Sequence, residues 1–65
     1  MVYKRLVRDG KNYHLEFFQL RGEMEVLLQV DVYDRKKEAQ SAFNKTVKWK
    51  NEEVFDASKV GNVEQ

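Results

Sequence analysis

The chain has 65 residues and a mass of 7.8 kDa, so it forms one small domain at most. It contains no cysteine, which excludes a disulfide framework and a zinc site built from thiolates. Its 12 basic and 11 acidic residues nearly balance, and no apolar run approaches the roughly 20 residues that span a bilayer or forms a signal peptide, so a soluble, cytoplasmic protein is expected.

Two glycine-containing turns predict a meander of three antiparallel strands. The Asp-Gly pair at 9–10 suits a tight type I′ turn, which predicts pairing of residues 2–8 with residues 12–20. The Arg-Gly pair at 21–22 predicts a second hairpin that joins 12–20 to 24–33. Each turn sets its register independently, and both registers bring the same side chains of the middle strand onto one face. This agreement supports the meander.

The third strand shows the clearest alternation in the chain. Every second residue is apolar, which predicts that one face of this strand lies in the core. Leu15 and Phe17 of the middle strand are expected on the same face. The residues of the third strand that are expected to face the core are Met24, Val26, Leu28, Val30 and Val32.

A helix is predicted after the third strand, over residues 35–50. Asp34 is a good N-cap, and the residues after it are strong helix formers. The apolar stripe that would face the sheet consists of Ala39, Ala42, Phe43 and Val47. Residues 46–50 also have strand propensity. The alternative is therefore a helix that breaks near Asn44, followed by a short fourth strand that holds Trp49.

The expected fold class is α+β: a three-stranded antiparallel β-meander followed by one α-helix packed on one face of the sheet (β-β-β-α). Residues 1–57 form the single small domain, and residues 58–65 are expected to be a flexible C-terminal tail. Charge is distributed unevenly along the chain. Acidic residues outnumber basic ones in 12–34, whereas 35–50 holds six basic residues and one acidic residue. The domain is therefore expected to be dipolar.

Catalytic and metal-binding chemistry find little support in the sequence. His14 is the only histidine, and it is expected beside Arg5 and Glu16 on the sheet surface, where such groups commonly form cross-strand pairs. The acidic residues match no calcium loop, and the glycines form no phosphate-binding loop. No enzymatic activity, catalytic residue, metal, other cofactor or small-molecule substrate is therefore expected.

The sheet face opposite the helix is the feature that points to function. One helix covers one face only, yet the registers place aromatic and aliphatic side chains on the other face, which is typical of an interface. We expect a non-enzymatic protein-binding or regulatory module that docks this half-apolar face, or a free strand edge, on another protein or on its own copy as a homodimer. The expected anchors are Tyr3, Phe18, Leu27 and Tyr33. The alternatives are that Val54, Phe55 and Val60 fold back over this face, or that the predicted register is off by one residue. Small cysteine-free chains are frequent among phage and mobile-element inhibitors, which makes a viral or mobile-element origin the expectation from size.

A nucleic-acid-binding domain is the alternative function. The helix is the basic element of the chain, and the first hairpin adds positive charge that would contact phosphates. The sequence pI of about 8.0 lies below the value of about 9 that dedicated nucleic-acid domains exceed, so this function is the second choice. The residues expected to bind nucleic acid are Arg5, Arg8, Lys11, Arg35, Lys36, Lys45 and Lys48.

The order of three strands and a helix that opens with Asp-Arg-Lys-Lys-Glu-Ala at 34–39 resembles the AP2-type domains and the arm-binding domains of tyrosine recombinases. The resemblance covers residues 1–50 and implies a sheet that reads DNA, braced by the helix. Those families carry Arg, Lys and Trp on the exposed sheet, whereas Glu16, Glu25 and Asp31 are expected there in this chain. The acidic residues disfavour DNA reading by the sheet, and membership of these families is not inferred.

Overall fold

The computed structural model describes residues 1–59 of the chain. The strands are β1 (Val2–Asp9), β2 (Asn12–Arg21), β3 (Met24–Tyr33), β4 (Lys48–Trp49) and β5 (Glu52–Asp56). One α-helix, α1 (Lys36–Lys45), follows β3, and a 3₁₀ turn, η1 (Ala57–Lys59), follows β5. The first two residues of the expected tail thus belong to η1, and its remaining residues, 60–65, lie outside the described part. None of the helices in the described residues is long and apolar enough to cross a membrane.

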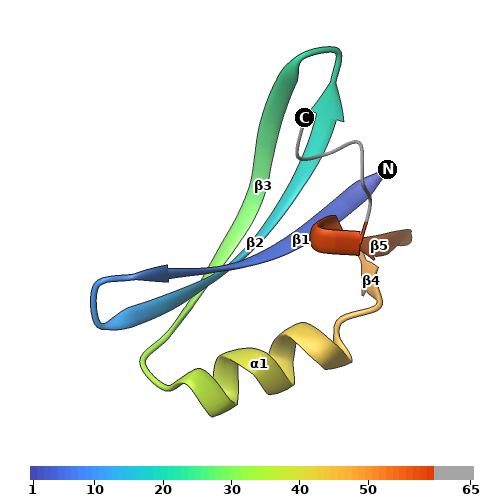
Figure 1. Cartoon of the computed structure of the whole chain (residues 1–65). Coiled ribbons are helices and arrows are strands. Elements are labelled where there is room, and N and C mark those ends of the chain that lie inside the picture. The colour runs from blue at the N-terminus through green and yellow to red at the C-terminus, as the bar shows by residue number, and fades with distance from the viewer. Residues whose placement is uncertain (60–65) are drawn as a thin grey trace.

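The five strands form one curled sheet in the order β3-β2-β1-β5-β4 (Figure 1). Strands β1, β2 and β3 form the antiparallel meander that the turns predict, and a helix follows them. The α+β class is therefore confirmed, but the β-β-β-α description is incomplete. Two further strands exist, and β5 pairs in parallel with β1 through Val54–Asp56 and Val2–Lys4. This pairing was not predicted because the chain returns to β1 only after α1, and no local turn indicates a parallel partner.

Both hairpins of the meander form, with registers shifted by two residues from the prediction. The loops are residues 10–11 and 22–23, since Asp9 pairs with Asn12 in the first hairpin and Arg21 pairs with Met24 in the second. Each loop begins with a glycine at a φ of 60° or 62°, the first-position conformation that a type II′ turn requires. A shift of two leaves the side chains of β1, β2 and β3 up to Leu27 on their expected faces, because the alternation of a strand has a period of two.

A β-bulge in β3 overturns the alternation predicted for this strand. The β2–β3 register shifts by one residue next to Phe17, and Leu28 is the extra residue in β3. A one-residue shift exchanges the two faces of all residues beyond it. Val30 and Val32 therefore face away from α1, where the prediction had them in the core. Tyr33 faces α1, where the prediction had it on the opposite face.

The helix α1 is shorter than predicted at both ends. It ends at Lys45, and Trp49 lies in the short strand β4, as the alternative interpretation had it. Asp34 is not the N-cap, because Arg35 occupies that position with an extended backbone and no side chain bonds to the first turn. Val47 follows the helix end and is 66% exposed, so its predicted place in the apolar stripe is wrong.

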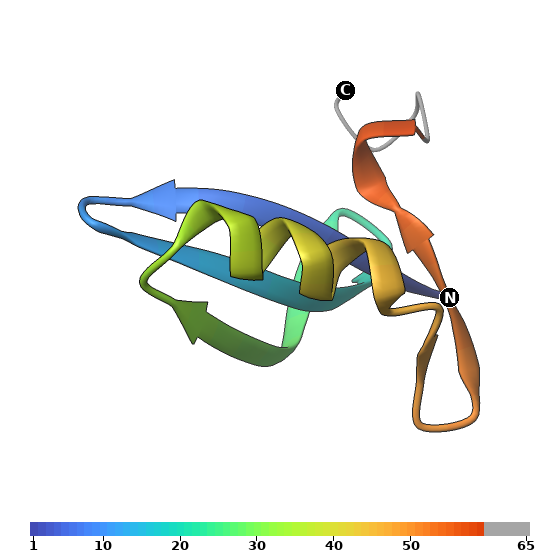
Figure 2. The same cartoon turned by 90° about the horizontal axis from the view of Figure 1, so that it is seen from below.

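The face of the sheet that α1 covers, here called the inner face, holds the larger core. Helix α1 lies across β1, β2 and β3 (Figure 2), with Ala39 fully buried against them. The buried centre of this core consists of Val2, Leu15 and Phe17. The half-buried residues packed around it are Leu6, Leu28, Tyr33, Ala42, Phe43, Trp49 and Val54.

A second, smaller core lies on the opposite or outer face. Tyr3, Phe18 and Ala57 are buried there, with Phe55 packed against them. The rings of Tyr3 and Phe18 stack with their centroids 5.7 Å apart. η1 and the side chain of Phe55 thus cover part of the outer face, as the alternative predicted for Phe55. Val54, in contrast, packs on the inner face, and Val60 lies outside the described residues.

Candidate protein-binding surface

The outer face of β3 exposes a row of apolar side chains that β5 and η1 leave uncovered. Leu27 is 55% exposed, Val30 37% and Val32 58%. Each is paired with an outer-face residue of β2, so the three side chains project to the same side of the sheet. These three residues are called the β3 patch below. Because single exposed aliphatic residues are ordinary, the contiguity of the row is what distinguishes it.

Strand β3 is also an edge of the sheet. It pairs with β2 on one side, and no strand of the described residues pairs with its other side. The backbone N–H and C=O groups on that side are free to pair with an added strand. The β3 patch therefore combines exposed apolar side chains with an adjacent row of hydrogen-bonding groups.

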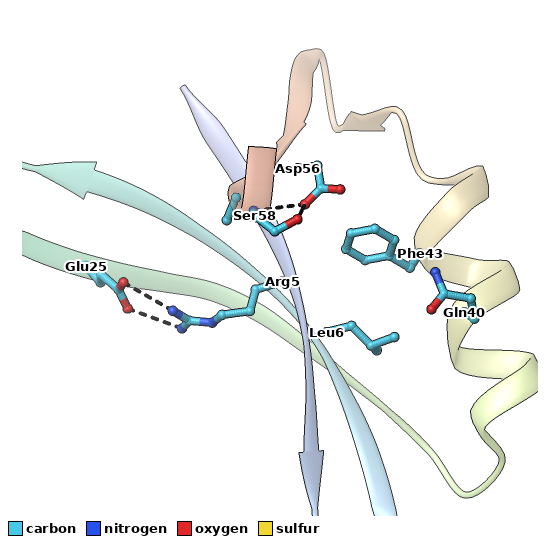
Figure 3. Close-up of a pocket in the computed structure, with 8 residues that line it drawn as sticks. Arg5, Leu6, Glu25, Gln40, Phe43, Asp56 and Ser58 are labelled. Carbon is cyan, nitrogen blue, oxygen red and sulfur yellow. Dashed lines mark hydrogen bonds and ion pairs between the residues drawn. The ribbon is translucent and has the colours of Figure 1, made fainter. Parts of the chain in front are cut away.

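A charged cluster borders the patch toward β1. The guanidinium of Arg5 donates to Glu25 at 3.2 Å (Figure 3). It also donates to Glu16 at 2.8 Å and lies 4.5 Å from the ring centre of Phe18. Burial alone would lower the pKa of Arg5, but the hydrogen bonds and charges of Glu25 and Glu16 outweigh it and raise the pKa. Arg5 is thus a fixed cation whose charge is neutralised within the chain.

The structure separates the four expected anchors. Leu27 is exposed on the outer face, as predicted. Tyr3 and Phe18 are on the predicted face but are buried against Phe55 and Ala57, so they are core residues. Tyr33 lies on the inner face because of the bulge and packs against the larger core. Only Leu27 of the four is therefore placed to contact a partner from the outer face.

The structure does not bring the expected nucleic-acid contacts together. Arg5 is held by two carboxylates, as described above. Arg8 and Lys11 lie at the tip of the β1–β2 hairpin, at the same end of the sheet as the start of α1, where Arg35 and Lys36 are found (Figure 1). Lys45 and Lys48 lie at and beyond the other end of α1. The seven residues therefore do not form one surface: four lie at one end of the sheet, two lie at the other end of α1, and Arg5 is held in ion pairs within the chain.

His14 lies on the outer face in a pairing that differs from the prediction. The register places it opposite Val7, and Arg5 opposite Glu16. The imidazole Nε2 is 3.5 Å from a carboxylate oxygen of Asp9, which is exposed at the hairpin end. The described residues contain no group of three or more His, Cys, Asp or Glu side chains that could hold a metal ion.

The prediction from the sequence missed two of the three residues of the β3 patch. Val30 and Val32 follow the alternation of a core-facing strand, and only the bulge at Leu28 turns them outward. No glycine or proline within five residues of Leu28 marks the bulge in the sequence. Comparisons with protein-family models, with curated proteins and with solved structures find no match to this chain.

Proposed function

We propose that the chain is a non-enzymatic protein-binding module whose contact surface is the β3 patch. The observation that supports this is the row Leu27, Val30 and Val32, exposed together on the outer face of an edge strand. Apolar side chains at the centre with charged groups at the border are typical of protein interfaces. The charged border here is the Arg5–Glu25 pair. The partner is another protein or a second copy of the chain.

The proposal is tested with a variant that makes the patch polar and keeps its strand propensity. Leu27→Thr combined with Val32→Thr does so, because threonine is a good strand former. Val47→Thr is the matched control, since Val47 is 66% exposed but lies outside the sheet surface in question. Circular dichroism and thermal melting first establish that all variants fold as the wild type does.

The measurement is affinity capture from the lysate of the source cells, with and without nuclease, followed by mass spectrometry. We expect a stoichiometric protein that the wild type and Val47→Thr retain and the double variant loses. Self-association lost in the same double variant would make the partner a second copy. Equal capture by all three forms would refute the patch as the contact surface. Capture that disappears with nuclease would favour nucleic-acid binding through the basic groups instead.

A further inference from the structure

The edge of β1 that faces β5 is only partly paired. β5 contacts β1 at Val2–Lys4 and then turns away into η1. Within the described residues, no strand pairs with the remaining part of this edge, residues 5–9. Alternate backbone N–H and C=O groups there are left without a strand partner. This edge does not include Leu27, Val30 or Val32 of the β3 patch.

A pocket of about 600 Å³ lies where β5 leaves β1. The apolar part of its wall comes from Leu6, Phe43 and Ala57. Its polar part comes from Arg5, Glu25, Gln40, Asp56 and Ser58. Helix α1 forms one side and η1 the other, with β1 between them (Figure 3). The free edge of β1 together with these two walls is called the β1 groove below.

The wall formed by η1 is held in place by local hydrogen bonds. One carboxylate oxygen of Asp56 accepts from the backbone N–H of Ser58 at 3.0 Å and from its hydroxyl at 2.7 Å. Ala57 is buried against Tyr3 and Phe18 of the outer core. The closed end of the groove is thus fixed by packing, which limits the ordering cost for a bound segment.

The open end of the groove is basic. Leu6 and Gln40 both line the pocket, and Arg8 lies two residues beyond Leu6 on the same face of β1. Lys36 lies one turn before Gln40 on α1. Two residues of a strand span about 7 Å, and four residues of a helix span about 6 Å. Arg8 and Lys36 therefore lie on opposite sides of the groove, at a similar distance beyond Leu6 and Gln40 toward its open end. Both side chains are exposed, and Lys11 adds positive charge at the hairpin tip.

We infer that the β1 groove binds an extended segment of a partner protein, which adds as a strand to residues 5–9 of β1. The unpaired backbone edge favours a peptide, because only a peptide backbone satisfies successive N–H and C=O groups. The segment carries an apolar side chain in the pocket beside Leu6 and Phe43. Two residues away, on the same side, it carries a carboxylate that faces Arg8 and Lys36. Asp9, the residue after Arg8, has its carboxylate beside His14 on the outer face.

The probes are two capped seven-residue threonine peptides with Leu-Thr-Glu or Glu-Thr-Leu at the centre, one for each strand direction. The first readout is amide chemical shifts and hydrogen exchange of the ¹⁵N-labelled full chain, with peptide at millimolar concentration. We expect shifts and slower exchange in residues 5–9 and shifts in η1, with the amides of Leu27, Val30 and Val32 unchanged. The same peptide N-methylated at alternate backbone nitrogens should bind roughly tenfold more weakly, because it lacks donors for the strand edge.

Charge variants test the chemistry assigned to the segment. Arg8→Glu with Lys36→Glu should weaken binding roughly tenfold, whereas Lys45→Glu with Lys48→Glu, which changes the net charge equally at the other end of α1, should not. A peptide with lysine in place of glutamate should show the same loss. The Leu27→Thr, Val32→Thr variant should bind normally, so this inference and the proposed function fail independently. The inference is overturned if neither peptide binds, or if the N-methylated peptide binds equally well. It is also overturned if exchange slows at the β3 patch instead of β1, or if a second copy of the chain fills the groove as the protein concentration rises.

Discussion

The indole Nε1 of Trp49 donates a 3.0 Å hydrogen bond to the side-chain oxygen of Gln29, which joins β4 to β3. These are the two outermost strands of the sheet. In a flat sheet they would be four inter-strand spacings apart, about 19 Å. The bond therefore shows that the sheet curls around the inner core. The side-chain amide of Gln19 in β2 also donates to a carboxylate oxygen of Glu52 in β5 at 3.3 Å. These two strands are not neighbours in the sheet either, because β1 lies between them.

Replacing Gln29 by alanine should lower the free energy of unfolding by about 1 kcal/mol, because the indole N–H loses its acceptor. Urea unfolding followed by circular dichroism measures this change. Trp49→Phe is the partner variant, since it keeps an aromatic ring in the core but has no donor. In the Trp49→Phe background, Gln29→Ala should cost almost nothing further. Additive losses would show that Gln29 acts through another contact.

Phe18 and Leu27 are paired across β2 and β3, yet their substitution should have opposite consequences. Phe18→Ala should destabilise the chain by about 3–5 kcal/mol, because the ring is fully buried between Tyr3, Arg5 and η1. So small a domain has little stability to lose, so this variant is expected to be largely unfolded. Leu27→Ala should change stability by no more than about 0.5–1 kcal/mol, since its side chain is mostly exposed. Thermal melting of both variants decides the matter, and a folded Phe18→Ala chain would contradict the burial.

The elements predicted well from the sequence are those set by local signals. Two Gly-containing turns and the alternation in 12–20 identify the meander, and a run of helix formers identifies α1. The remaining features depend on contacts distant in sequence. β5 becomes a strand by pairing with β1, and the bulge at Leu28 lets Gln29 face inward toward Trp49. The make-up of the β3 patch depends on this bulge. Leu27 precedes the bulge and was predicted on the outer face, whereas Val30 and Val32 follow it and were predicted in the core.

Lys50 is the only residue other than glycine with a positive φ in the described chain, at 54°. It lies in the turn between β4 and β5, and this backbone conformation costs a residue with a Cβ about 1 kcal/mol. Lys50→Gly should therefore be more stable than Lys50→Ala by about 1 kcal/mol. Both variants lose the ammonium that lies 4.7 Å from the Trp49 ring centre, so the comparison isolates the backbone. Equal melting temperatures would show that the turn relaxes in the alanine variant.

Lys4 is a buried cation of the inner face that holds the end of α1. Its Nζ donates to the carbonyl of Thr46 at 2.8 Å and to that of Phe43, and it lies 4.4 Å from the Phe43 ring centre. A cation at a helix C-terminus is stabilised by the helix dipole. Lys4→Met keeps the aliphatic bulk but leaves both carbonyls without this donor, so it should lower the free energy of unfolding by about 1–3 kcal/mol at neutral pH. Urea unfolding measures the loss, and Lys48→Met, at an exposed position, is the control.

The pH dependence of this loss follows from the environment of Lys4. Burial lowers the pKa of its ammonium, Asp56 raises it by a smaller amount, and Lys59 lowers it. Between this lowered pKa and the ordinary value of 10.5, the unfolded chain binds a proton that the folded chain has released. The free energy of unfolding therefore rises with pH in this window, while the neutral amine still has N–H groups for both carbonyls. The stability difference between wild type and Lys4→Met should grow toward pH 10.5, and a difference that shrinks as pH rises would show that ion pairing with Asp56 outweighs burial.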